Sequence, residues 1–274
     1  MRIAGRRGGS LAYRLALSYL LVLGTAAVAA PWIAPHSPTA QNLSQRFAPP
    51  SRDHLLGTDD FGRDILSRII HGSRAALLVG VVSVAIAVVL GMTAGLVAAL
   101  SPGIVDNAVM LVMDSLLSFP TVLLAITVVS FLGYGLVQVM IAIGVIYSPT
   151  FARLVRAEAL VIKGEEYVEA SRSLGSGSLK VAFRHIVPNL SGKVIVQASV
   201  TFALAVVVEA SLSYLGLGTQ PPAASWGLML KDARNFLVQA PWMALYPGLI
   251  LALTVLSFNV IGDTLSERLN PKIG

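Results

Sequence analysis

The sequence predicts an all-α protein that crosses a membrane several times. Hydrophobic residues make up 55% of its 274 residues and charged residues only 12%, about half the charged fraction of a soluble domain. A helix of about 20 apolar residues is long enough to cross the roughly 30 Å hydrocarbon core of a bilayer. The long runs that carry few or no charged side chains predict six spans, at residues 15–34, 76–100, 108–132, 136–154, 195–217 and 242–262.

The first span has some features of a cleavable signal peptide. Arginines precede its apolar core, and the Ala-Val-Ala-Ala sequence at 27–30 resembles a cleavage site. Pro31 follows these small residues directly and disfavours cleavage, and the apolar run is long enough to span a bilayer. We therefore expect a retained anchor helix, with a signal peptide as the alternative.

The residues between the first two spans, 35–74, are expected to form an extended connector and not a packed domain. Their prolines fix φ and remove backbone donors. Apolar residues at 65, 66, 69 and 70 make a helical stripe, which we expect to lie along the membrane interface. In a later loop, Trp226 and Trp242 stand near prolines at the edge of a span, and they are interpreted as interface anchors.

Two breaks are expected in the third and fourth spans. Residues 115–152 carry no charged side chain and are too long for one crossing, so Gly133-Tyr134-Gly135 is expected to be a tight turn. The same tripeptide occurs in potassium filters, but a filter needs several carbonyl-lined residues in a re-entrant loop. Pro120 is expected to kink the third span.

Two acidic residues, Asp114 and Glu209, lie in or near apolar spans. An ionised carboxylate in the middle of a bilayer costs roughly 2.5 kcal/mol or more on insertion scales, so such residues usually face a cavity or a partner. One interpretation is that both line a path for a solute. The other is structural pairing at a subunit interface, and the sequence leaves both open.

A polar segment of unusual length, residues 153–193, separates the fourth and fifth spans. Glu165 and Glu166 fall in the first turn of a predicted short helix, where carboxylates complement the helix dipole. Gly175 is a plausible left-handed residue at its end. A second short helix is predicted at 179–185, and Pro188 marks either its boundary or the start of span five. The segment is either a contact surface for another protein or a solvated loop.

The charge distribution predicts the orientation of the chain. If the amino terminus is cytoplasmic, 13 of the 20 Lys and Arg residues fall in cytoplasmic segments, as the positive-inside rule requires. The net charge of +6 is then a topological signal, and we expect no nucleic-acid partner.

Several kinds of chemistry are not expected. The chain has no cysteine, which excludes disulfides and thiolate metal sites. It lacks the phosphate-binding loop of ATPases, because Gly192-Lys193 is followed by Val194. The histidines at 36, 54, 71 and 185 have no metal-ligand spacing, and no Ser/His/Asp set is placed for catalysis. We expect no catalytic residue, no metal site and no cofactor in this chain.

The polar segment resembles the signature of inner-membrane permease subunits of ATP-binding-cassette (ABC) importers. That signature reads Glu-Ala-Ala, three residues, Gly, nine residues, then Ile-x-Leu-Pro. Glu169, Ala170, Gly175 and Pro188 match it. Three positions depart from it: Ser171 replaces the second alanine, His185 the isoleucine and Val187 the leucine.

Further stretches are similar to the dipeptide, oligopeptide and nickel branch of that family, so the resemblance covers nearly the whole chain. They are residues 56–64, 184–189, 213–218 and 263–271.

The resemblance implies a type I importer permease fold, with an anchor helix and a five-helix core, in a bacterial cytoplasmic (inner) membrane. The implied divisions are a cytoplasmic amino terminus and anchor helix (1–34), an extracytoplasmic connector (35–74), a permease core (75–264) with a cytoplasmic coupling segment (155–190), and a cytoplasmic tail (265–274).

The resemblance also implies partners. They are a second homologous permease, one or two kinds of cytoplasmic ABC ATPase that bind ATP and Mg²⁺, an extracytoplasmic substrate-binding protein and membrane lipid. The short helix at 165–174 would then sit in a cleft of the ATPase, as a helix in a groove. The implied coupling residues are Glu166, Glu169, Ala170, Ser171 and Gly175.

The implied function is ATP-driven import of short peptides. A nickel complex or another small solute is the alternative within this class. Outside it, the alternatives are a secondary transporter driven by an ion gradient and a membrane scaffold without a pore.

Overall fold

The computed structural model describes residues 5–269, and every regular element in that range is helical. The helices are, in chain order, α1 (Gly5–Ile33), α2 (Ile65–Leu100), α3 (Ile104–Leu117), α4 (Thr121–Leu132), α5 (Leu136–Lys163), α6 (Glu166–Ser173), α7 (Ser178–Val181), α8 (Val187–Tyr214), α9 (Trp226–Ala233) and α10 (Trp242–Leu269). The predicted all-α class is confirmed.

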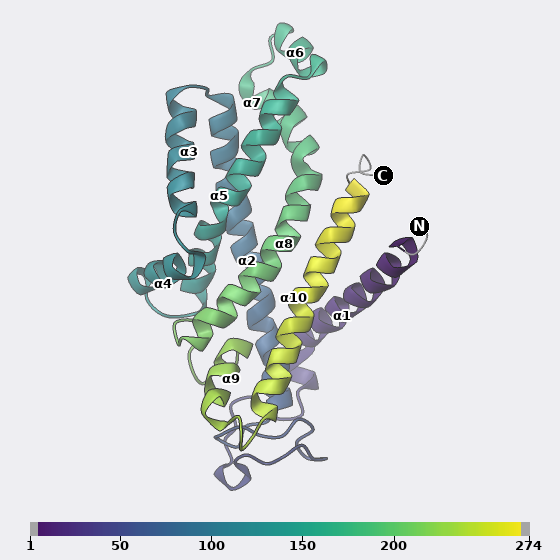
Figure 1. Cartoon of the computed structure of the whole chain (residues 1–274), viewed down its shortest axis with the longest axis vertical. Helices are drawn as coiled ribbons and strands as arrows, with labels where there is room; N and C mark the ends of the chain where they lie inside the picture. The colour runs from purple at the N-terminus through teal and green to yellow at the C-terminus, as the bar shows by residue number, and fades with distance from the viewer. Residues whose placement is uncertain (1–4, 270–274) are drawn as a thin grey trace.

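The long helices form a bundle with α2, α5 and α8 in its middle and α10 and α1 on one flank (Figure 1). The helices α6 and α7 project from one end of this bundle. The loop 35–64 and α9 lie at the other end (Figure 1). Helix α1 begins, and α10 ends, in the half of the bundle that carries α6.

Five helices within residues 5–269 are long and apolar enough to cross a membrane, namely α1, α2, α5, α10 and the helix that runs through α7 into α8. The helices α3 and α4 pass the same test only as a pair. Five of the six predicted spans therefore correspond to long apolar helices, and the third corresponds to the bent pair of α3 and α4.

The third predicted span, 108–132, is not a kinked helix. The axes of α3 and α4 differ by 99°, and residues 118–120 separate the two helices. With 14 and 12 residues, the two are about 21 Å and 18 Å long, so neither can cross a 30 Å core alone. Pro120 precedes the first turn of α4, where its missing N–H is not needed. The predicted bend therefore does lie at Pro120, but it separates two helices and is not a kink within one helix.

Helix α2 begins at Ile65, eleven residues before the predicted second span. The stripe at 65–70 forms its first turns, so the prediction of a separate interfacial helix is wrong. Asp64 caps this end, because its Oδ2 accepts hydrogen bonds from the backbone N–H (2.8 Å) and the hydroxyl (2.7 Å) of Ser67. At 36 residues, α2 is about 54 Å long and extends well beyond a bilayer core. The boundary expected at residue 74, between the connector and the permease core, therefore falls inside this helix.

Residues 35–64 form a compact cap, which contradicts the predicted extended connector. The chain turns back on itself, so that the Asn42 N–H donates to the Phe61 carbonyl (3.1 Å) and the Phe47 N–H to the Asp59 carbonyl (3.1 Å). A Cβ at Gly62 would overlap the Asn42 carbonyl. The prolines restrict the chain locally, but buried polar contacts hold it together.

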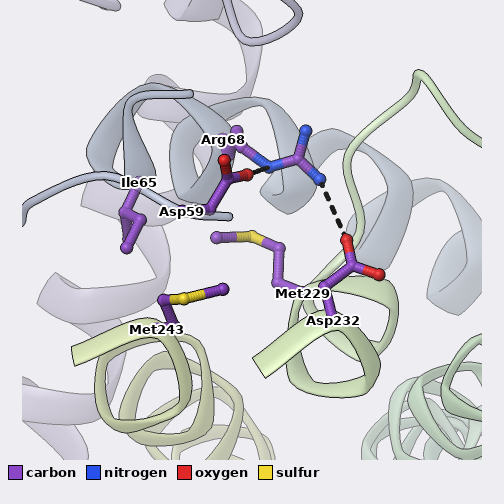
Figure 2. A pocket seen from close by; sticks show the side chains of 6 residues that line it. All are labelled: Asp59, Ile65, Arg68, Met229, Asp232 and Met243. Carbon is purple, nitrogen blue, oxygen red and sulfur yellow. Dashed lines mark ion pairs between the residues drawn. The ribbon is translucent and has the colours of Figure 1, made fainter. Parts of the chain in front are cut away.

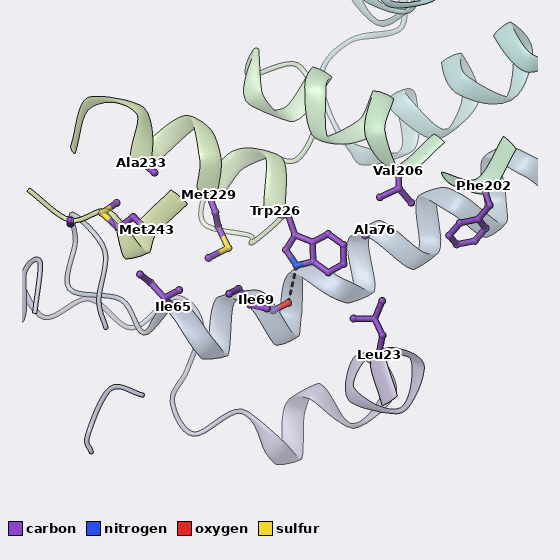
Figure 3. Close-up of a cluster of buried hydrophobic side chains, with 11 residues drawn as sticks. Leu23, Ile65, Ile69, Ala76, Phe202, Val206, Trp226, Met229, Ala233 and Met243 are labelled. Carbon is purple, nitrogen blue, oxygen red and sulfur yellow. Dashed lines mark hydrogen bonds between the residues drawn. The ribbon is translucent and has the colours of Figure 1, made fainter. Parts of the chain in front are cut away.

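An apolar cluster joins five helices, α1, α2, α8, α9 and α10, next to this cap (Figure 3). Trp226 of α9 lies at its centre with only 1% of its surface exposed, and its indole N–H donates to the Ile69 carbonyl (3.1 Å). Leu23 of α1 and Val206 of α8 belong to the same cluster. Trp226 is therefore a core residue, and the prediction that it anchors the membrane interface is wrong. Trp242 also bonds within the protein, from its indole to the Thr58 carbonyl (3.1 Å).

Candidate coupling site

The predicted short helix in the polar segment is present as α6, Glu166–Ser173. Glu165 caps it in an extended conformation, and Glu166 and Glu169 lie in its first turn, where carboxylates complement the positive end of the helix dipole. After the helix, Gly175 adopts a φ of 86°. The N–H of Gly175 donates to the Arg172 carbonyl (2.8 Å), which confirms the predicted glycine end.

One buried side chain fastens α6 to the bundle. Val168 is fully buried, in a cluster that also contains Val155 of α5, Val181 of α7 and Leu190 of α8. Close-packed side chains of this kind transmit displacement. A movement of α6 would therefore reach α5 and α8 through this cluster.

Two of the three departures from the family signature contact each other. The Ser171 hydroxyl donates to the Ser176 hydroxyl (3.0 Å), and His185 Nε2 lies 3.3 Å from Ser171 Oγ. The His185 ring also lies 5.7 Å from that of Tyr167, whose hydroxyl accepts from Asn189 (3.1 Å). The serine and the histidine thus form a polar link between α6 and the start of α8.

The second predicted short helix is only partly correct. It begins as α7, Ser178–Val181, but continues through a wide turn at Ala182–Ile186 directly into α8. Pro188 lies in the first turn of α8, where proline is tolerated. Of the two roles considered for Pro188, the start of span five is the correct one.

The tip of the segment exposes both acidic and large apolar side chains. Glu166, Glu169 and Ala170 are exposed on α6. Leu174, Leu179 and Phe183 are 89%, 72% and 69% exposed. Large apolar side chains this exposed are candidates for a contact surface. The signature motif does not include these three residues, and no periodic pattern distinguishes them in the sequence.

The two acids in apolar spans have different surroundings. Asp114 of α3 is half-exposed and accepts from Arg153 of α5 (2.7 Å). Two turns earlier, Asp106 pairs with Arg156 through two bonds of 2.6 Å. Glu209 of α8 is 1% exposed, and its carboxylate accepts from the Ser213 hydroxyl (2.6 Å). The structure therefore places Asp114 at the surface of the described chain and Glu209 in its interior.

At the opposite end, the motif at 56–64 forms a buried ionic cluster that the sequence did not predict. Asp59 accepts from the Arg63 Nε (2.6 Å) and lies 3.5 Å from Arg68, which lies 3.9 Å from Asp232 of α9 (Figure 2). Burial, together with the negative charges of Asp59 and Asp232, raises the pKa of Asp60. This cluster attaches the cap to α2 and α9.

A bundle of long apolar helices with a short, exposed polar helix at one end is the architecture of a multi-pass membrane protein with a segment outside its spanning helices. Residues 87–274 match the family described as binding-protein-dependent transport system inner membrane component, and residues 14–50 match the N-terminal transmembrane domain of oligopeptide transport permease C. The chain belongs to this permease family. It is a multi-pass membrane permease of a bacterial ABC importer.

Related proteins align with most of this chain. It is 41% identical to the di/tripeptide transport system permease protein DppC of Pseudomonas aeruginosa, over 94% of this chain and 87% of the relative. It is 44% identical to the glutathione transport system permease protein GsiD of Pectobacterium atrosepticum, over 82% of this chain and 74% of the relative. A chain of the MetNI methionine ABC transporter, solved in inward-facing conformations, superposes with a TM-score of 0.61 at 18% identity, over 74% of this chain and 96% of that one.

Proposed function

We propose that this permease forms, with a second homologous permease, the path by which di- and oligopeptides enter the bacterial cytoplasm. Separate ATPase subunits, which bind ATP and Mg²⁺, supply the energy. Peptides are favoured because the relative from Pseudomonas aeruginosa is named as a di/tripeptide permease. The observation that carries the coupling role is α6, an exposed acidic helix with an apolar tip that is packed onto two spanning helices.

In this proposal, α6 enters a cleft of the ATPase, with Glu166 and Glu169 making polar contacts. Ala170, which is exposed and small, permits close approach. Ser171 keeps α6 in register with α8 through His185. Gly175 sets the angle between α6 and α7 by its positive φ. Closure of the ATPases moves α6, and the buried Val168 cluster passes this movement to α5 and α8.

The proposal places α6 and both termini in the cytoplasm. The excess of Lys and Arg in those segments supports this orientation. So does the arrangement of the bundle, in which α1 begins and α10 ends in the half that carries α6 (Figure 1). The cap and α9 then face outward, where an extracytoplasmic binding protein delivers the substrate.

Asp114 is the better candidate for the translocation path, because its half-exposed carboxylate is accessible from outside the chain. Glu209 is enclosed within this chain, where it accepts from Ser213, so it favours a structural role inside the subunit over both a solute path and pairing at a subunit interface. Asp114→Asn should change peptide uptake while leaving assembly intact, with Asp106→Asn as the control on the same helix. Loss of assembly in Asp114→Asn would instead support the subunit-pairing role.

The direct test is reconstitution of the permease with its neighbouring permease, ATPases and binding protein in liposomes. Uptake of a labelled dipeptide should require ATP and all of these proteins. Uptake by the purified chain under an ion gradient alone would establish a secondary transporter. Normal uptake by cells lacking the chain would establish a scaffold. ATP-dependent uptake of a nickel complex without peptide uptake would support the other substrate class.

A further inference from the structure

Three side chains that are distant in sequence meet at one edge of the cap. One ring nitrogen each of His36 and His54 and a carboxylate oxygen of Asp64 lie within 4.8 Å of one another. His54 Nδ1 is 2.9 Å and His36 Nδ1 is 3.7 Å from the same Asp64 Oδ1. Spacing along the sequence does not reveal this cluster, because its members come from three separate segments of the folded chain.

The remaining polar atoms of the cluster are held by other contacts. Asp64 Oδ2 accepts hydrogen bonds from the backbone N–H and the hydroxyl of Ser67, so Oδ1 is left to face the two imidazoles. The Nε2 atom of His54 lies 3.1 Å from the Gln45 Oε1. With an ion bound, that contact would hold the proton on Nε2 and leave the Nδ1 lone pair for the metal. Without an ion, His54 Nδ1 donates to Asp64 Oδ1 (2.9 Å), so metal binding would release that proton. The backbone of His36 is anchored by its N–H, which donates to the Ser67 hydroxyl (3.0 Å).

Two of the three distances between the ligand atoms suit a tetrahedral ion, and the third, between the two histidines, is at most 4.8 Å. Metal–ligand bonds of about 2.0–2.1 Å in a tetrahedral site place neighbouring ligand atoms about 3.3 Å apart. The two distances to Asp64 Oδ1, 2.9 and 3.7 Å, lie on either side of that value. His54 and Asp64 are buried, whereas the His36 side chain is 42% exposed and has room to move into place.

A cavity of about 640 Å³ opens beside the cluster, and all three residues line it together with Gln45 and Asp53. A coordination position directed into this cavity would be open to water. The ionic environment also suits a cation. Among residues 11–269, the ion-pair partners of Asp64 are the two histidines, and no Arg or Lys side chain in that range lies within ion-pair distance of it.

We propose that His36, His54 and Asp64 form a binding site for a divalent transition-metal ion of the zinc class. Two imidazoles and one carboxylate are the ligands of many zinc sites. Mg²⁺ and Ca²⁺ require oxygen ligands and are disfavoured here. The bound ion links the segment after α1, the middle of the cap and the start of α2. It therefore acts as a cross-link that holds the cap on the bundle.

The test uses the full permease, in its assembled complex or in nanodiscs, purified through a tag without histidines. After chelator treatment and dialysis, Zn²⁺ alone is titrated and the retained metal is counted by mass spectrometry. We expect one Zn²⁺ per permease chain and a rise in the thermal unfolding temperature. Co²⁺ in place of Zn²⁺ should give the visible absorption of a four-coordinate ion.

Two variants probe the ligands. His36→Ala removes the most exposed ligand, and Asp64→Asn removes the charge but keeps a side chain that caps helices well. Both should lose at least tenfold in Zn²⁺ affinity, and His36→Ala should abolish the four-coordinate Co²⁺ spectrum. His71→Ala is the matched control, since His71 lies near the same helix end and bonds to the Ser67 carbonyl (3.0 Å). It should bind Zn²⁺ like the original protein.

The proposal fails if the original protein retains no Zn²⁺ after dialysis, because the cluster is then a set of hydrogen bonds only. It also fails if His36→Ala binds Zn²⁺ with unchanged stoichiometry and affinity. These measurements do not involve peptide uptake, so they are independent of the proposed transport function.

Discussion

Gly175 is a residue whose backbone conformation, and not its packing, defines its role. Its φ of 86° lies in the left-handed region, and a Cβ placed there would meet no atom within 4 Å. A substitution at this position therefore strains the backbone without any clash. Gly175 lies in the four-residue connection between α6 and α7, so its torsion contributes to their relative orientation.

We expect Gly175→Val to uncouple transport. The left-handed conformation costs a side chain with a Cβ roughly 1–2 kcal/mol, and about 1.4 kcal/mol corresponds to a tenfold change in an equilibrium. ATP-dependent dipeptide uptake should fall by about that factor or more, while membrane insertion stays normal. Gly177→Val is the control, because Gly177 has a φ of −68° and equally open surroundings. Equal activity of both variants would contradict the role of Gly175.

Asp60 provides a second prediction at the residue scale, on pH dependence. Burial first, and then repulsion from Asp59 and Asp232, raises the pKa of Asp60 in the folded state. A raised folded-state pKa means that the carboxyl stabilises the fold most below its usual pKa. This stabilisation is lost as the pH rises through the raised value.

Asp60→Asn should therefore raise the thermal unfolding temperature at neutral pH relative to the original protein. The difference should shrink as the pH falls through the raised pKa, where Asp60 itself becomes neutral. Tryptophan fluorescence can follow unfolding, since Trp226 and Trp242 both pack near the cap. Asp53→Asn, at an exposed carboxylate of the same cap, should have no such effect. If the difference in unfolding temperature between Asp60→Asn and the original protein grew as the pH fell, the raised pKa of Asp60 would be contradicted.

At the scale of elements, α6 is a short helix with a single buried residue among its eight. Its own packing is small, so its exposed surface is available for a partner. Leu174, Leu179 and Phe183 are large, exposed apolar side chains next to this surface. Burying them against a partner would remove a large apolar area from water, which favours binding.

Leu174→Asp should weaken retention of the ATPase without unfolding the permease. Truncating a central contact residue typically costs more than 1–2 kcal/mol of binding, so co-purification of the ATPase should fall by roughly tenfold. Val238→Asp is the control, because Val238 is fully exposed near the opposite end of the bundle. Undiminished co-purification with Leu174→Asp would exclude this tip from the interface.

The elements also show what the sequence could predict. Long uncharged runs located the spans, and Gly175 with the glutamates at 165 and 166 located α6, because these signals are local. Pro120 located the break before α4, but its 99° angle was not predicted, since a proline indicates an interruption but not its angle. The packed cap was missed because burial of Arg63 and Arg68 depends on acids brought together by folding. The extra turns of α2 carry polar residues that hydropathy excludes from a span.

At the scale of the whole molecule, the orientation in the membrane can be tested directly. The natural chain contains no cysteine, so Ser51→Cys in the cap and Ser173→Cys at the end of α6 each introduce one exposed thiol. A membrane-impermeant maleimide should label Ser51→Cys in intact cells with a permeabilised outer membrane. It should label Ser173→Cys only after lysis. The reverse pattern would place α6 on the wrong side for an ATPase.

The right-angle elbow between α3 and α4 has a consequence for what surrounds it. No side chain caps the start of α4, and residues 118–120 are exposed in the described chain. Hydrocarbon tails offer no hydrogen-bond acceptors for the free N–H groups of a helix start, so irregular backbone at membrane depth requires protein or water around it. If this elbow lies at membrane depth, lipid tails are therefore excluded from residues 118–120, and either water or a neighbouring protein chain must contact them.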